Sequence, residues 1–201
     1  MRFTTAELAT QILYRYVQCG RLTELPMDHV TRCSTAAAFR IALVLNEQTH
    51  IPLSELVRMG QNNKGQNRFT KEEICLSEWH IFHCMDDSML SPPTIEGCVK
   101  GYVEGFQEAA IVLPVDFRQV LEELICLAIH GILFLEYPVQ WVGLGIVVLA
   151  LRLCQGQHIW EAQVAVLYGE VGIEEGSPVA DGISEICARL LILNAHFPIS
   201  S

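Results

Sequence analysis

Apolar residues recur with helical spacing along nearly the whole chain, and no segment shows the apolar/polar alternation of a half-buried β-strand. In the first expected helix, Leu8, Ile12, Leu13 and Val17 share one face, and Gly20 is expected to end the helix. The pattern predicts an all-α fold. The chain has 201 residues, of which 51% are hydrophobic, enough for one large or two small domains with packed interiors.

Capping residues, prolines and glycines divide the rest of the chain into further helices. Thr70 and Glu73 have the spacing of a capping box, in which each side chain satisfies the other residue's backbone N–H group. Asp116 and Gln119 show a similar spacing and predict a second such start. Residues 61–68 are predicted to form an exposed loop. The later helices are expected at residues 27–45, 52–60, 71–84, 94–110, 116–135, 138–154, 159–168 and from 178 onward.

The most apolar stretch covers residues 137–151 and carries no charge. It is shorter than the ~20 residues that a membrane-spanning helix needs. We therefore interpret it as a buried core helix and expect no membrane partner. Gly143 and Gly145 lack the preceding strand and the third glycine of a dinucleotide-binding loop, so they predict close helix packing instead.

Pro92 and Pro93 break the helical pattern near the middle of the chain. We place a domain boundary near Ser91, with one domain at residues 1–91 and another at residues 92–201. Each part contains a long helix, a central helix rich in small residues, a short helix after a loop and a long closing helix. This order indicates a weak internal repeat.

The charge balance narrows the classes of partner. Thirteen basic and 23 acidic residues give a net charge of −10, which repels phosphate backbones and argues against general nucleic-acid binding. Only 18% of residues are charged and the mean hydropathy is +0.30, so we expect another protein to cover some apolar surface. The eight cysteines stand singly, without zinc-site or redox spacing, and predict a reduced, intracellular chain. No signal-peptide pattern opens the chain.

Four segments, in their order and spacing, resemble parts of one family of helical proteins. Residues 36–48 are similar to the central third helix of a cyclin box, and residues 68–79 are similar to its fifth helix. The Pro93-Thr94 pair looks like the hinge into the second box. Residues 137–145, followed by Leu149-Ala150, resemble the start and the small-residue central helix of that second box.

The resemblance implies two tandem cyclin-type helical bundles and a non-catalytic regulatory subunit of a cyclin-dependent protein kinase. Cyclins press their third and fifth helices against a mobile kinase helix. On that basis Glu78 matches the family's acidic contact, and Glu47 matches one acid of its Lys-x-Glu-Glu motif. Leu45 or Asn46 occupies the lysine position, and Trp79 is the best candidate for a binding hot spot.

Two departures from the family pattern bear on binding. The lysine is absent, and truncating one partner of a buried charge pair commonly costs ~2–5 kcal/mol. The first helix of the first box also has no counterpart, because residues 4–19 already align with the second. We therefore expect apolar side chains along residues 27–45 to be bare, and a partner or a second copy of the chain to cover them.

Three alternatives remain at this point. The core of transcription factor IIB also stacks two cyclin folds, but it needs a basic face for DNA. A scaffold without kinase activation is the second alternative, and an enzyme is the least favoured. His80, His83 and Cys84 have the spacing of metal ligands, but we interpret them as an exposed helix rim. We expect no cofactor and no metal, and we expect a nuclear or cytoplasmic location.

Overall fold

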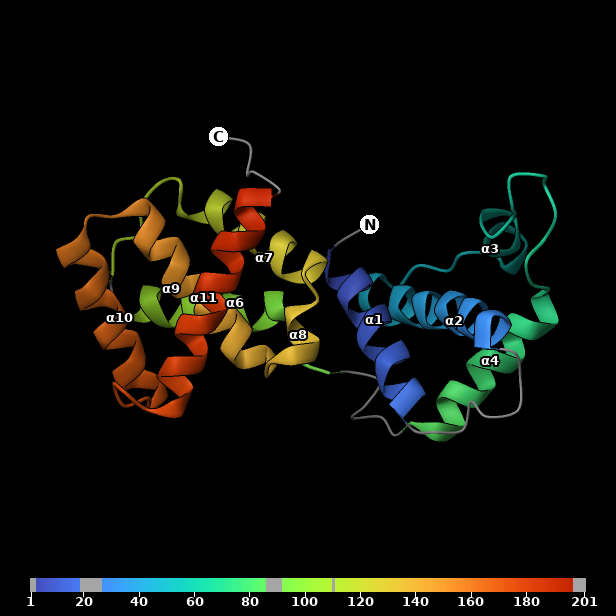
Figure 1. The fold of residues 1–201 in the computed structure, drawn as a ribbon, viewed down its shortest axis with the longest axis horizontal. Helices are drawn as coiled ribbons and strands as arrows, with labels where there is room; N and C mark the ends of the chain where they lie inside the picture. The colour runs from blue at the N-terminus through green and yellow to red at the C-terminus, as the bar shows by residue number, and fades with distance from the viewer. Residues whose placement is uncertain (1–2, 19–26, 86–91, 110, 197–201) are drawn as a thin grey trace. The chain divides into compact units, whose positions relative to one another are not determined.

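The computed structural model describes residues 3–18, 27–85, 92–109 and 111–196. The chain divides into two compact units, Met1–Pro92 and Pro93–Ser201, called unit 1 and unit 2 below. The expected boundary residue Ser91 lies outside the described residues. Within those residues there are ten helices and no strand, which confirms the all-α fold class (Figure 1).

Unit 1 is built around its longest helix, α2. The helices of this unit are α1 (Phe3–Gln18), α2 (Met27–Glu47), α3 (Leu53–Met59) and α4 (Lys71–Cys84). Helix α2 packs against both α1 and α4, and α3 packs against α4. The small residues Ala37, Ala38 and Ala42 of α2 are fully buried, as expected for a helix that its neighbours approach closely.

The buried face of α1 differs in part from the predicted one. Leu8 and Ile12 lie in the core as expected, but Val17 is exposed and Tyr16 is buried in its place. The core face therefore follows the i, i+4 series Leu8, Ile12 and Tyr16. Gly20, the predicted end of this helix, lies outside the described residues.

The two predicted capping boxes have opposite outcomes. At the start of α4, the Thr70 hydroxyl accepts a hydrogen bond from the Glu73 backbone N–H, and the Glu73 carboxylate accepts one from the Thr70 N–H, as predicted. The prediction for Asp116 is wrong, because its side chain makes no capping hydrogen bond. Asp116 has helical backbone angles (φ −82°, ψ −5°), whereas an N-cap residue needs an extended backbone.

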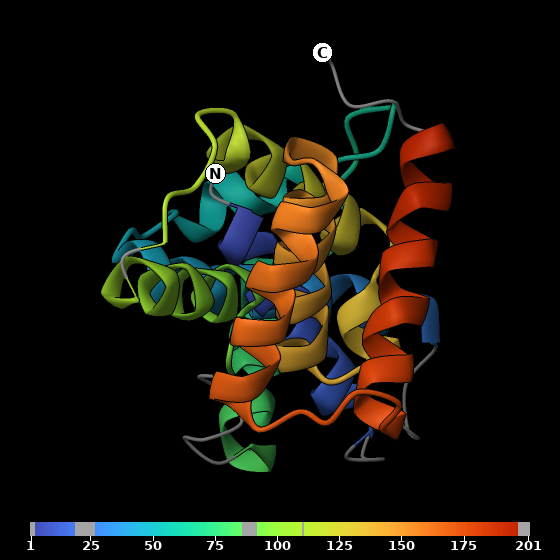
Figure 2. The same ribbon diagram turned by 90° about the vertical axis from the view of Figure 1, so that its left-hand side faces the viewer.

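Unit 2 has a fully enclosed helix, α9, at its centre. Its helices are α6 (Ile95–Glu108), α7 (Phe117–His130), α8 (Leu133–Glu136), α9 (Val139–Cys154), α10 (Gln157–Val171) and α11 (Pro178–His196). Helix α9 packs against the other five (Figures 1 and 2). Every residue from 142 to 151 is buried. This confirms the predicted core helix. Among the described helices, none has the length and apolar character needed to cross a membrane.

Several helix boundaries differ from prediction, three of them clearly. The single helix expected over residues 116–135 is interrupted: α7 stops at His130, and Ile132 takes a left-handed conformation (φ 49°) before α8. Helix α10 is longer than the expected 159–168 at both ends, since it begins at Gln157 and continues to Val171. The expected end of α6 at Ala110 lies outside the described residues, and the helix ends at Glu108.

Seven cysteines fall in the described residues, and they form no disulfide with one another. Cys33 and Cys187 are buried and behave as the small core hydrophobes expected from the sequence. Burial raises the pKa of the Cys187 thiol to about 11. Cys75 is exposed and the other four are partly buried. The expectation that most cysteines are core residues therefore holds for Cys33 and Cys187 alone among the described cysteines.

The glycines of α9 permit the close helix packing predicted for them. A Cβ atom on Gly143 would lie 2.8 Å from the Cβ of Cys98 and 3.4 Å from the backbone N of Val99, both on α6. On Gly145 it would lie 2.8 Å from Cγ2 of Ile186 on α11. Because Cβ and backbone atoms cannot rotate away, α6 and α9 would have to separate to admit a side chain at position 143.

We expect Gly143→Ala to destabilise unit 2, and Gly101→Ala is its matched control. Both glycines lie inside helices, so each substitution gains up to about 1 kcal/mol of helix propensity. Gly101 has open space around its Cβ position. The free energy of unfolding, measured by urea denaturation, should therefore be about 1–3 kcal/mol lower for the overpacked Gly143→Ala variant than for Gly101→Ala. Equal stability of the two variants would contradict the close packing.

Candidate protein-binding groove

A shallow groove of about 190 Å³ lies on unit 1 between α2 and α4. Its surface is almost entirely apolar, with one ion pair and one histidine at its edges. The residues that line it are Arg40, Ile41, Val44, Leu45, His50, Glu78 and Phe82. The groove thus brings together two residues predicted from sequence, Leu45 near the end of α2 and Glu78 in the middle of α4.

Arg40 and Glu78 form the charged part of the groove. Nη1 of Arg40 donates to both carboxylate oxygens of Glu78, each at 2.6 Å. The two side chains are only 23% and 14% exposed, so water screens the pair incompletely. The Nε atom of Arg40 is buried and has no hydrogen-bond acceptor among the described residues. The pair joins α2 to α4 and leaves a donor unused beside the groove.

Large apolar side chains stand exposed around the groove. Leu45 is 44% exposed and lies at one edge, and Phe82 on α4 is 52% exposed. Trp79, one turn before Phe82, is 53% exposed, and Leu76 on the same helix is also exposed. Aromatic side chains that are half exposed on one helix are typical of protein-binding anchors.

The Trp79 ring is held in place by histidine. The ring of His83 lies 3.8 Å from it, centroid to centroid, with a tilt of 32°, and that of His80 lies edge-on at 5.1 Å. Nδ1 of His83 also lies 3.1 Å from the Trp79 carbonyl oxygen. In the described part of the chain, no three His, Cys, Asp or Glu side chains are grouped so as to hold a metal ion. Both histidine rings pack against the Trp79 ring.

Asn46 and Glu47 do not face the groove in the way expected for direct contacts. The Asn46 side-chain amide donates to the Thr5 hydroxyl at 2.9 Å, and that hydroxyl donates to the Glu47 carboxylate at 2.5 Å. Thr5 lies on α1 and is fully buried. These two predicted site residues therefore fasten the end of α2 to α1.

The expectation of a bare apolar face along α2 is wrong for the side chains that the structure describes. From Thr31 to Glu47, Leu45 is the one large apolar residue that is exposed. Helix α1 and helix α4 cover the others, because α2 packs against both. The uncovered apolar surface lies on α4 instead, at Leu76, Trp79 and Phe82.

Sequence reasoning missed Arg40 and Phe82. A signal for Arg40 was present, since it is the one charged residue in the stretch 36–46 and a charge in an apolar helix face needs a partner. Its partner, 38 positions away, could not be identified from spacing. Phe82 was indistinguishable from a core residue, because an aromatic residue at helical spacing usually lies inside.

No family model, no curated protein and no solved structure matches the chain. The geometry alone points to one kind of chemistry for this groove. An apolar trough flanked by aromatic side chains can accept the apolar face of a helix from another protein, and the ion pair can set its register.

We expect the Arg40–Glu78 pair to contribute measurably to the stability of unit 1. In a double-mutant cycle of Arg40→Gln and Glu78→Gln, the coupling energy should be about 1–3 kcal/mol, since the pair is largely shielded from water. The matched control is the pair Arg118 and Glu122, which is 90% and 65% exposed. A coupling for Arg40 and Glu78 no larger than that of the control, measured by urea denaturation, would show that the pair does not join the helices.

Proposed function

We propose that the protein is a cyclin-like regulatory subunit that binds a cyclin-dependent protein kinase through the groove of unit 1. The observation that carries the proposal is the meeting of Leu45 and Glu78 in one apolar groove, next to the exposed Trp79 and Phe82. In the cyclin resemblance, these positions belong to the two helices that contact the kinase. The protein would then act in the nucleus or the cytoplasm.

The helix order of both units supports a tandem cyclin arrangement. In unit 1, α2 is the central helix, followed by the short α3 and the closing α4. In unit 2, α9 is central, preceded by α6 and α7 and followed by α10 and α11. The first box in this arrangement lacks its first helix, since α1 corresponds to the second.

Binding at the groove would regulate a kinase by shifting its conformational population. A ligand changes such an equilibrium only by the difference in its affinity for the two states. Leu45, Trp79 and Phe82 can supply this difference in affinity if they contact the mobile kinase helix only when that helix is in the position of the active kinase. No cofactor is needed, because the contacts are between protein side chains.

A second candidate is binding without activation, as in a scaffold. Leu45 or Asn46 stands where the family pattern has lysine, and the Asn46 amide is already bonded to Thr5. Glu47 accepts a hydrogen bond from the same threonine. The usual charged contacts at the end of α2 are therefore engaged within unit 1. A transcription factor IIB-like role is less favoured, because the net charge of −10 opposes DNA binding.

We expect Trp79→Ala and Phe82→Ala each to weaken kinase binding strongly. Removal of an aromatic hot spot commonly costs at least about 2 kcal/mol, or roughly a 30-fold rise in Kd. Binding to a panel of purified cyclin-dependent kinases can be measured by isothermal titration calorimetry, and kinase activity in the same mixtures separates activation from scaffolding.

Ile192→Ala is the matched control for these variants. Ile192 is an exposed apolar residue on α11 of unit 2, so its loss should leave Kd unchanged. Co-purification from the native host followed by mass spectrometry provides an independent test. Recovery of polymerase machinery without a kinase, or kinase binding that ignores both aromatic substitutions, would refute the proposal.

A further inference from the structure

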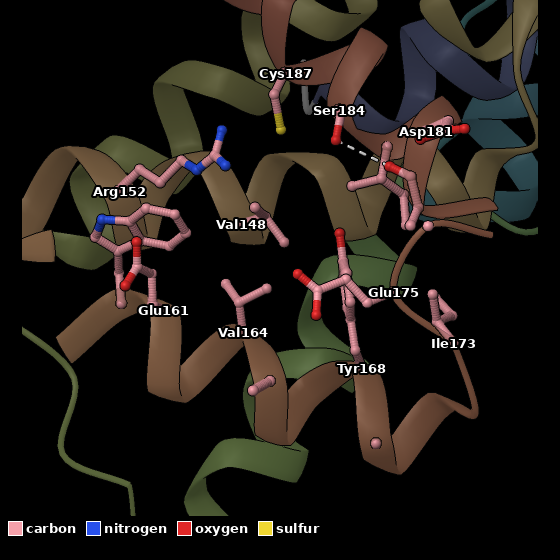
Figure 3. Close-up of a pocket in the computed structure, with 16 residues that line it drawn as sticks. Val148, Arg152, Glu161, Val164, Tyr168, Ile173, Glu175, Asp181, Ser184 and Cys187 are labelled. Carbon is pink, nitrogen blue, oxygen red and sulfur yellow. Dashed lines mark hydrogen bonds between the residues drawn. The ribbon is translucent and has the colours of Figure 1, made fainter. Parts of the chain in front are cut away.

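Unit 2 contains a cavity of about 730 Å³ that the proposed function does not use. Its walls come from α9, α10, α11 and the turn between the last two helices (Figure 3). This volume lies within the ~300–1,000 Å³ typical of pockets that bind small molecules. Apolar and charged side chains share the lining, so the cavity suits a ligand that combines an apolar body with a charged group.

The lining of the cavity is acidic overall. Three carboxylates line it, those of Glu161, Glu175 and Asp181. Arg152 is the one basic residue among the described residues that form the walls. The lining therefore has a net charge of −2, which favours a cationic ligand over an anionic one. The net charge of −10 on the whole chain acts in the same direction.

The side of the cavity at Arg152 contains charges of both signs. The Arg152 guanidinium carbon lies 4.4 Å from the centroid of the Trp160 ring, a cation–π contact that holds the long side chain. Glu161 lies on the same side (Figure 3), and its carboxylate accepts a hydrogen bond from the Gln157 side-chain amide at 2.9 Å. One guanidinium and one carboxylate leave this side without a net charge.

The net negative charge lies on the side formed by the turn between α10 and α11. Gly172 and Gly176 take left-handed conformations there (φ 70° and 77°), which glycine adopts at no steric cost. Between them, Glu175 directs its carboxylate into the cavity (Figure 3). Asp181, in the first turn of α11, lies on the same side. A ligand cation is therefore attracted to this side of the cavity.

A tyrosine adds a second group that can contact a cation. Burial raises the pKa of the Tyr168 phenol, Cys187 and Glu175 raise it further, and Arg152 lowers it. Because the net effect is to raise the pKa, the phenol stays neutral at pH 7. Its oxygen can accept a hydrogen bond from an ammonium group, and the face of its ring attracts a cation.

We infer that this cavity binds an organic amine. The protonated amino group pairs with the Glu175 carboxylate and contacts Tyr168, and the apolar body of the ligand lies against Val148 and Val164, which line the middle of the cavity (Figure 3). A free amine and the lysine side chain of a protein segment share this chemistry. The inference does not depend on the groove of unit 1 or on its partner.

The inference can be tested with three probes of similar shape and different charge. Phenethylamine is a cation at pH 7, phenethyl alcohol is neutral and hydrocinnamate is an anion. Each is titrated against the intact protein, with binding measured by ligand-observed NMR. The amine should bind about fivefold or more tightly than the alcohol, the gain of one partly exposed ion pair, and the anion should bind most weakly.

Glu175→Gln should lower the affinity for phenethylamine by about fivefold and leave that for the alcohol unchanged, because only the ion pair is lost. Glu174→Gln is the matched control. It removes the same charge from the neighbouring position, which is exposed and does not line the cavity, so amine binding should not change. Circular dichroism checks that each variant is folded, and Trp79→Ala should leave amine binding unchanged.

A short peptide with a lysine next to a phenylalanine distinguishes the two sources of the amino group. Tighter binding of the peptide than of phenethylamine assigns the cavity to a lysine of a partner protein, and weaker binding assigns it to a free amine. Three results would overturn the inference: no binding of either amine, an alcohol or anion that binds as tightly as the amine, or amine binding that is indifferent to Glu175→Gln.

Discussion

The complete burial of α9 is the constraint from which the architecture of unit 2 follows. A helix that is apolar on every side must be surrounded, because any face left in water would expose a row of large aliphatic side chains. Five helices enclose it, and they can approach closely because Gly143 and Gly145 carry no side chain. The enclosure ends at Arg152, the first charged residue of the helix, and the cavity opens at that point.

The central helix of unit 1 is enclosed less completely, and the candidate groove results from that difference. Helix α2 is covered by α1 and α4 over most of its described length, but Leu45 emerges near its end. A charge pair, Arg40 with Glu78, then takes part in joining α2 to α4 where unit 2 uses aliphatic contacts. An ion pair at a helix junction is directional, so it fixes the relative position of Leu45 and Phe82 across the groove.

Local signals in the sequence predicted most of the fold, and they failed where backbone geometry or distant partners decided the outcome. Thr70 and Asp116 stand at similar capping-box spacings, yet only Thr70 has the extended backbone that lets its side chain reach the helix N–H groups. Of the predicted site, Leu45 and Glu78 meet in the groove, whereas Asn46 and Glu47 bond to Thr5 of α1. The spacing of residues along α2 cannot predict that Asn46 bonds to the Thr5 hydroxyl, which lies 41 positions away in the sequence.

The two units expose different side chains beside their central helices, α2 in unit 1 and α9 in unit 2. On α4, apolar residues also occupy the exposed face at Leu76, Trp79 and Phe82, so unit 1 offers a mainly apolar surface beside the Arg40–Glu78 ion pair. On unit 2, the chain turns through two left-handed glycines after α10, and this turn brings Glu175 to the cavity that Arg152 enters from α9. The groove of unit 1 is thus mainly apolar, whereas the cavity of unit 2 is lined by Arg152 together with the carboxylates of Glu161, Glu175 and Asp181. The apolar surface of unit 1 and the charged cavity of unit 2 therefore both arise where the packing around a central helix is incomplete, at Leu45 on α2 and at Arg152 on α9.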